Sequence, residues 1–256
     1  MAAVTTAAIL LRAHPYSESS RVLRFYTLAL GLVGAMARGV RRGASRGRGG
    51  SGAFSEGVAV LAVRDNRDLQ TLQEFAPAKT RFGLARDVSR LAGASLAAEL
   101  VLRHAGQEPH EELYRALSGG LDRLEHASPE EVLGELLALG WAIVQILGFG
   151  PELEACVACG RSLEGGAMGW FDLSAGGSRG SCCQPPQGAR RIGPVARHQL
   201  GRLLAGEPPT GLRGLRAHLS LLDDFTAFHM LGGQRLGSFR FLEPATAGQQ
   251  DAATED

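Results

Sequence analysis

Apolar residues form short runs over about the first 75 residues of the chain, and turn signals separate these runs. The breaks stand at His14-Pro15, Gly31, a glycine-rich loop and Asp65-Asn66. We therefore predict five strands, at residues 4–11, 21–27, 31–38, 56–63 and 69–75. Five short strands in one segment fit a small closed barrel, and the five-stranded oligonucleotide-binding (OB) barrel is the architecture that we expect.

After Pro77 the apolar period changes from two to 3.6, which is typical of helices. Leucine and valine stripes predict one helix over residues 84–100 and a second over 113–124. Similar patterns predict helices at 194–204 and 215–226. The barrel is therefore followed by a helical domain.

The middle of the helical region contains the clearest helix start. Ser128 is placed as the N-cap, Pro129 stands at the first helical position, and Glu131 closes a capping box. The residues from Val132 to Leu147 are apolar almost all round the helix. This pattern predicts a helix at the buried centre of a bundle.

Four cysteines lie between the third and fourth predicted helices. Cys156 and Cys159 have the two-residue spacing of a zinc knuckle. Cys182 and Cys183 are adjacent instead, and Gly180 stands where the first cysteine of a second knuckle would be. We predict that all four hold one structural Zn²⁺ per chain, while a partial site and four unrelated thiols remain open alternatives.

These patterns together predict an α+β multidomain chain. Residues 1–79 would form an OB-fold β-barrel, and residues 80–150 with 194–242 an α-helical domain. Residues 151–193 would be a zinc-knuckle insertion. Residues 243–256 are small, polar and acidic, and we expect them to be disordered.

The glycine-rich loop between Gly31 and Gly52 carries five arginines and no acid. Residues 1–80 hold 11 basic and 5 acidic residues (net +6), whereas residues 81–256 hold 16 and 21 (net −5). Clustered guanidinium groups repel one another unless an anion arrives, and a phosphate backbone suits several of them at once. A solvated surface loop in an arginine-rich chain is the alternative interpretation.

We expect the barrel to bind DNA mainly through its phosphates. Loop arginines would clamp the backbone, strand arginines would extend the track, and an aromatic side chain on the second strand would stack a base. The predicted DNA-contacting residues are Arg21, Arg24, Tyr26, Arg38, Arg41, Arg42, Arg46 and Arg48.

An enzymatic alternative rests on His110-Glu111-Glu112 together with the Cys156–Cys159 pair. These residues resemble the zinc deaminase pattern H-x-E…P-C-x-x-C, with Glu112 as the general acid and base of a nucleic-acid-modifying reaction. Ala155 replaces the proline of that pattern. We therefore favour a non-catalytic protein.

The sequence also bears on the cellular location of the chain. Its first residues lack the cationic start of an export signal. The longest apolar run, Leu136 to Gly150, is too short for a membrane span. We expect a cytoplasmic protein, associated with the nucleoid if it binds DNA, with no membrane partner.

Several segments resemble the RecO family of bacterial recombination mediators, over about residues 5–242. Arg38 stands where that family often has lysine, and the second cysteine pair is displaced. The matching segments are Tyr16-Ser17-Glu18-Ser19-Ser20, Ala37-Arg38-Gly39-Val40-Arg41-Arg42, Leu147-Gly148-Phe149-Gly150-Pro151, the Cys156–Gly160 knuckle, Gly176-Gly177 before Cys182, and Arg235-Leu236-Gly237-Ser238.

The resemblance implies a fold and a function. It implies a protein that binds single- and double-stranded DNA, anneals complementary strands and helps to load RecA in recombinational DNA repair. The implied partners are RecR and the single-strand DNA-binding protein, with RecF and RecA as indirect ones.

Overall fold

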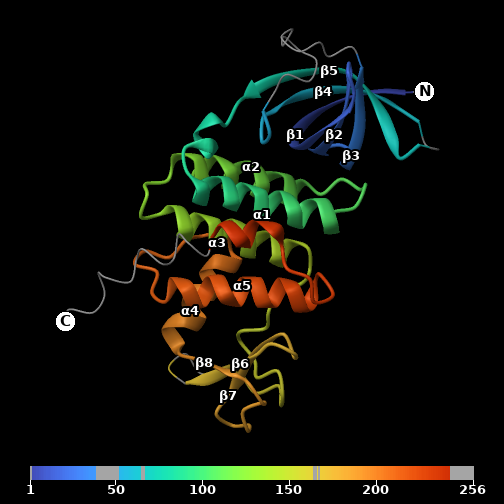
Figure 1. Ribbon diagram of the computed structural model, residues 1–256. Coiled ribbons are helices and arrows are strands. Elements are labelled where there is room, and N and C mark those ends of the chain that lie inside the picture. The colour runs from blue at the N-terminus through green and yellow to red at the C-terminus, as the bar shows by residue number, and fades with distance from the viewer. Residues whose placement is uncertain (1, 39–51, 65–66, 164–165, 167, 243–256) are drawn as a thin grey trace.

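A computed structural model describes residues 2–38, 52–64, 67–163, 166 and 168–242 of the chain. It has three parts in a row (Figure 1): a barrel at one end, a helical bundle in the middle, and a small sheet at the other end. Two predictions from the sequence concern residues outside these ranges: the tail at 243–256 and most of the glycine-rich loop.

Five strands close the N-terminal barrel in the order β1-β2-β3-β5-β4. Neighbouring strands are antiparallel except β3 and β5, which are parallel. This is the OB fold expected from the sequence. Phe25 and Phe75 meet inside the barrel, with ring centroids 5.1 Å apart. The strands are β1 (Ala2–Ser17), β2 (Ser20–Thr27), β3 (Gly31–Arg38), β4 (Glu56–Val63) and β5 (Leu69–Lys79).

Two strands run past prolines that we expected to end them. β1 continues through Pro15, and β5 continues through Pro77. Among the described strands, each proline is paired with a neighbouring strand on one side only. Each also lies beside a shift in the pairing register. A residue without an N–H is tolerated at such places because no ladder hydrogen bond is lost.

The helical bundle is built around α3 (Val132–Ile146), which packs against four other helices and buries Trp141 completely. It begins after Glu131, later than predicted, although the Glu131 side chain still accepts a hydrogen bond from the Ser128 amide at 3.0 Å. The remaining helices are η1 (Phe82–Ala85), α1 (Val88–His104), α2 (Glu111–His126), α4 (Pro194–Leu204), α5 (Leu215–His229) and η2 (Gly237–Phe241).

The first predicted stripe was wrong in part. Val88 and Leu91 are exposed on α1, while Leu96 and Leu100 are fully buried.

Every described helix is too short or too polar to cross a lipid bilayer.

The barrel and the bundle meet at a buried ion cluster around Arg81. Its guanidinium donates to Glu56 of β4 at 2.5 Å and to Asp122 of α2 at 2.7 Å. Tyr114 and Ser118, also on α2, donate to the Glu56 carboxylate at 3.0 and 2.6 Å. The cluster therefore ties the barrel wall to α2 through charge-assisted hydrogen bonds.

This cluster predicts that stability falls in acid. Burial acts to raise the pKa of Glu56, but hydrogen bonds from Ser118 and Arg81 lower it on balance. The pKa of Asp122 is lowered in the same way, against burial, by Lys79 and Arg81. A carboxylate whose pKa is lower in the folded state stabilises the fold above its unfolded pKa of about 4, and this stabilisation is lost as the pH falls through the folded pKa.

The measurement is thermal unfolding between pH 7 and pH 3, for the wild type and for Glu56→Gln. We expect the variant to be the less stable protein at pH 7, and the difference between the two to shrink below about pH 4, as the wild-type carboxylate is protonated. A difference that stayed constant over this range would contradict the assignment.

The third part is a small sheet between α3 and α4, with the order β7-β6-β8. One of its faces packs on the bundle, where Phe171 lies 6.1 Å from Phe225, centroid to centroid. His229 of α5 bonds to the Leu173 carbonyl at 2.7 Å. Its strands are β6 (Gly169–Asp172), β7 (Gly177–Gly180) and β8 (Arg190–Ile192), and we did not predict them from the sequence.

Candidate metal centre and nucleic-acid interface

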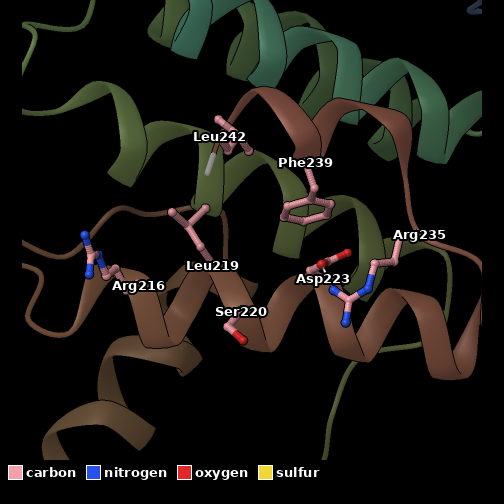
Figure 2. A pocket seen from close by; sticks show the side chains of 7 residues that line it. All are labelled: Arg216, Leu219, Ser220, Asp223, Arg235, Phe239 and Leu242. Carbon is pink, nitrogen blue, oxygen red and sulfur yellow. Dashed lines mark hydrogen bonds and ion pairs between the residues drawn. The ribbon is translucent and has the colours of Figure 1, made fainter. Parts of the chain in front are cut away.

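A cavity of about 440 Å³ lies between α5 and η2 (Figure 2). Its wall is apolar where Leu219, Phe239 and Leu242 meet. Its charged side chains include Arg235, which pairs with Asp223. The cavity therefore combines an apolar wall with a charged edge formed by Arg216, Asp223 and Arg235.

Cys156 and Cys159 lie on a tight turn. The Cys156 carbonyl accepts hydrogen bonds from the amides of Cys159 at 3.2 Å and Gly160 at 2.8 Å. Gly160 has a φ of 72°, in the left-handed region that glycine adopts without strain. The turn brings the two sulfur atoms to the same side, as the sequence spacing predicted.

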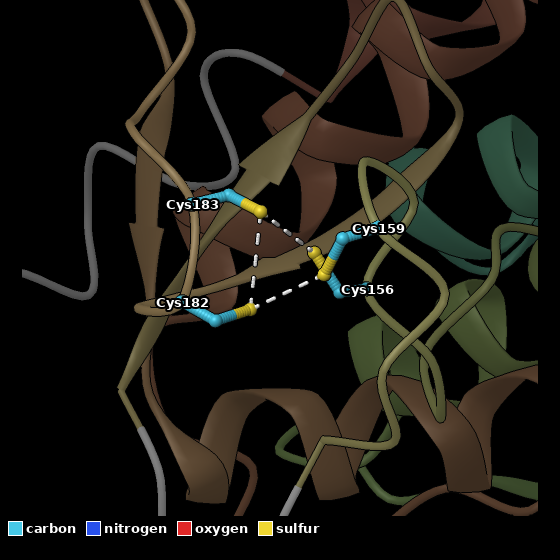
Figure 3. A group of neighbouring side chains, drawn as sticks. All are labelled: Cys156, Cys159, Cys182 and Cys183. Atoms are coloured by element: carbon cyan, nitrogen blue, oxygen red, sulfur yellow. Dashed lines mark hydrogen bonds between the residues drawn. The ribbon is translucent and has the colours of Figure 1, made fainter.

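The four cysteine sulfur atoms form one cluster (Figure 3), in which all lie within 4.8 Å of one another. Cys159 and Cys182 are 3.5 Å apart, sulfur to sulfur, and Cys183 lies 3.9 Å from both Cys156 and Cys182. Four sulfur atoms bound to one tetrahedral ion at about 2.3 Å would be about 3.8 Å apart. These cysteines can therefore hold a metal ion.

The displaced second pair reaches the cluster by a turn of its own. The Cys183 amide donates to the Gly180 carbonyl at 3.2 Å, which folds the chain back at Ser181. A Cβ added at Gly180 would lie 3.3 Å from the Cys182 sulfur atom and only 2.7 Å from the Leu163 side chain. The sulfur of Cys182 therefore lies next to the point where the Cβ atom of a cysteine at position 180 would be.

The environment of the cluster separates the acidities of its thiols. Burial acts to raise the pKa of Cys156, but amide hydrogen bonds, first of all from Gly180, lower it to about 6. Hydrogen bonding with Cys159 raises the pKa of Cys182, and it raises the pKa of Cys183 to about 12. Cys156 therefore ionises more readily than Cys182 and Cys183, which suits the first ligand of a metal.

The enzymatic alternative does not fit this geometry. Glu112 is exposed on α2, and His110 caps that helix by accepting a hydrogen bond from the Leu113 amide at 3.3 Å. Helix α2 lies on the barrel side of the bundle, whereas the cysteines lie beside β7 at the opposite end (Figure 1). Glu112 therefore cannot serve a reaction at the cysteine cluster, and four thiolate ligands around a metal ion would leave no open position for water.

The outer wall of the barrel carries part of the expected cationic track. Arg24 of β2 is half-buried and pairs in register with Arg12 of β1, which is exposed. Arg38, at the end of β3, is exposed and shares this side of the sheet. Like charges directly opposite each other destabilise a sheet, so this arrangement favours an anionic ligand. We had not predicted Arg12, because it lies beyond the expected end of its strand.

The prediction that Tyr26 stacks a base was wrong. Its side chain is 1% exposed, and its ring stacks on Tyr114 of α2 with centroids 6.5 Å apart. Burial raises the pKa of Tyr26 to about 12. Tyr26 shares the outer wall with Arg24 but lies at the end covered by the bundle. At the end of the barrel away from the bundle, Tyr16 of β1 is an exposed aromatic side chain, with 70% of its surface accessible.

The other predicted DNA-contacting residues fall into two groups. Arg21 lies on β2 and is half-buried. Its side chain emerges on the side of the sheet that is opposite to Arg24, because neighbouring residues of a strand alternate. The loop residues Arg41, Arg42, Arg46 and Arg48 lie outside the described residues.

Comparison with known proteins gives one family along nearly the whole chain. Residues 1–81 match the family described as "Recombination protein O N terminal", and residues 85–232 match "Recombination protein O C terminal". A "DNA repair protein RecO" of a Nocardioides species is 32% identical over 247 residues, covering 92% of this chain and 97% of the relative. A protein of the same name from an Anaeromyxobacter species is 32% identical over 250 residues, covering 92% of this chain and 94% of the relative. The chain therefore belongs to the RecO family of DNA repair proteins.

Proposed function

We propose that this protein is a non-catalytic recombination mediator, which binds single- and double-stranded DNA, anneals complementary strands and helps to load RecA. The observation that supports this most is the cationic wall of an OB barrel that carries Arg12, Arg24 and Arg38. An OB barrel with such a wall suits a phosphate backbone. The family name, DNA repair protein, agrees with a nucleic-acid ligand.

Annealing by such a surface requires no reaction chemistry. Two complementary strands repel each other through their phosphates, and cations that neutralise both backbones lower this repulsion. Contacts with phosphates carry no sequence information, so one surface serves any pair of complementary strands. The loop arginines Arg41, Arg42, Arg46 and Arg48 follow Arg38 in the sequence and would add further phosphate contacts.

The metal ion would be a structural Zn²⁺, one per chain. Four thiolates in a closed tetrahedral set are typical of structural zinc sites. The ligands would be Cys156, Cys159, Cys182 and Cys183. The zinc would hold together a segment whose three strands have only four, four and three residues.

RecR and the single-strand DNA-binding protein would be the protein partners, with RecF and RecA acting indirectly. The helical bundle offers a solvent-exposed surface for them between the two ends of the molecule (Figure 1). Arg115 and Arg123 lie on that surface, and each is paired, with Glu111 and Glu135. An acidic partner would have to compete with these carboxylates.

The loop arginines can be tested through salt dependence. Replacing Arg41 and Arg42 by Ala should reduce the slope of log affinity against log salt by about 1.8 on duplex DNA and by about 1.4 on single strands, because each lost phosphate contact removes about 0.9 or 0.7. Affinity should fall almost equally for all sequences. The measurement is fluorescence anisotropy of labelled oligonucleotides at several salt concentrations, together with an annealing assay, in which activity should fall with affinity.

The control removes two exposed arginines elsewhere, Arg115 and Arg240, with the same change of net charge. Arg197, on α4, would be a poor control because its side chain belongs to a residue that is only 8% exposed. The control variant should keep the wild-type salt slope. If the loop variant kept that slope and the control lost it, the DNA track would not run over the barrel.

A further inference from the structure

The outer face of the three-stranded sheet carries a tryptophan between two arginines. Trp170, on the central strand β6, pairs in register with Arg179 of β7 and with Arg191 of β8. Side chains directly opposite on neighbouring strands emerge on the same face, so these three stand in one row. The next residue, Phe171, points the other way and packs against Phe225 of α5. The row therefore faces away from the bundle.

The two arginines differ in whether their charge is paired within the protein. Arg179 donates to the carboxylate of Asp172 and, at 3.0 Å, to the Gln184 carbonyl, so its position is fixed and its charge is balanced. Arg191 is exposed and has no hydrogen bond or ion pair within the described part of the chain. Among the described residues, Arg191 therefore supplies a cation without an ion partner next to the indole ring, while Arg179 forms a rigid flank on the other side.

The chain has two tryptophans, and their environments are opposite. Trp141 lies at the centre of the bundle with no exposed surface, where a large aromatic side chain contributes most to folding. Trp170 is only partly covered and lies on a sheet surface. An aromatic ring that is partly open to solvent, beside an exposed guanidinium, is an arrangement on which proteins stack the bases of single-stranded nucleic acids, because every base has a π face.

We propose that this row is a second nucleic-acid contact surface, on which Trp170 stacks a base of a single strand and Arg191 holds a neighbouring phosphate. The proposal deepens the proposed function. The barrel and this sheet lie at opposite ends of the molecule (Figure 1), so one chain would hold two separate stretches of nucleic acid. Two such stretches would then be tethered to one molecule without a second copy of the protein.

Tryptophan fluorescence tests the proposal directly, because Trp141 is fully buried and Trp170 is partly exposed. Titration with a short oligothymidylate of about eight nucleotides, a length that suits a small single-strand site, should quench the emission of the wild-type chain. Trp141→Phe should keep the quenching, and Trp170→Thr should remove it. Threonine suits a strand, and unchanged circular dichroism and metal content would show that the sheet is intact.

Affinity gives a second readout, independent of the optical one. In a background with Arg41 and Arg42 replaced by Ala, Trp170→Thr should weaken oligothymidylate binding by about tenfold. Arg191→Gln should lower the salt slope by about 0.7, whereas Arg240→Gln, the matched loss of one exposed arginine, should leave it unchanged.

Each outcome decides the matter. Quenching that survives in the loop variant supports the second surface whether or not the barrel binds DNA. Unchanged emission while the labelled oligonucleotide binds overturns it and leaves the barrel as the site. Equal quenching by an acidic peptide such as polyglutamate also overturns it, in favour of a protein-binding surface.

Discussion

Replacing Arg81 by Met is expected to lower the free energy of unfolding by about 3 kcal/mol, because it removes the buried cation that pairs with Glu56 and leaves Asp122 with only the exposed Lys79. For a chain of this size the melting temperature should fall by roughly 6–12 °C. The Arg81 side chain is 1% exposed and binds Glu56 and Asp122. It also donates to the Phe54 carbonyl at 2.8 Å and to Ser118 at 3.2 Å. Thermal unfolding followed by circular dichroism measures the change.

The matched control is Arg115→Met, which breaks an ion pair on the same side of the bundle. Arg115 pairs with Glu111, and these side chains are 77% and 62% exposed. Exposed pairs within a helix contribute at most about 0.5 kcal/mol, so the melting temperature should barely move. Arg81→Lys should not restore stability, because one ammonium cannot reach all the acceptors of a planar guanidinium. Equal shifts for Arg81→Met and Arg115→Met would show that the cluster stabilises nothing.

The Arg81 cluster is one of the features of the fold that the sequence alone does not predict. The limits of β3, β4 and α4 agree with the predicted ranges, because local signals determine them: a turn at Gly31, or Pro194 at the start of a helix. The extensions of β1 and β5 depend on which neighbours a strand pairs with, and a single segment does not contain this information. The partners of Arg81 lie on β4, on α2 and in the turn before β4, so the spacing of Arg81 from any one of them along the sequence does not predict the cluster.

The candidate sites also contain features that local spacing predicts and features that depend on the tertiary fold. The spacing of Cys156 and Cys159 predicts a metal knuckle, and the cluster contains both. That the adjacent Cys182 and Cys183 complete it depends on a turn at Gly180 that the sequence does not reveal. Alternation along β2 correctly places Arg24 and Tyr26 on one side, but only the docking of α2 buries Tyr26. Pairing across three short strands likewise brings Trp170 beside Arg191.

Loss of the metal is expected to unfold the sheet insertion altogether. We expect about one Zn²⁺ per chain in protein purified without chelator, and none after Cys156→Ser, since that sulfur is buried and accepts the Gly180 amide. Binding of structural zinc contributes about 10–16 kcal/mol of apparent free energy to the folding of small domains. Strands of three or four residues supply far less. Elemental analysis and limited proteolysis between residues 151 and 193 are the measurements.

Two further comparisons separate the role of the metal from general damage. A chelator should make the wild-type insertion protease-sensitive and should leave Cys156→Ser unchanged, because the variant has no ion to lose. Cys182→Ser should also lose zinc if the displaced cysteine is a ligand. DNA binding at the barrel should keep its salt slope in both variants, whereas quenching of Trp170 should disappear with the sheet that presents it. Purified wild-type protein without metal, or Cys182→Ser with a full zinc content, would refute the four-cysteine site.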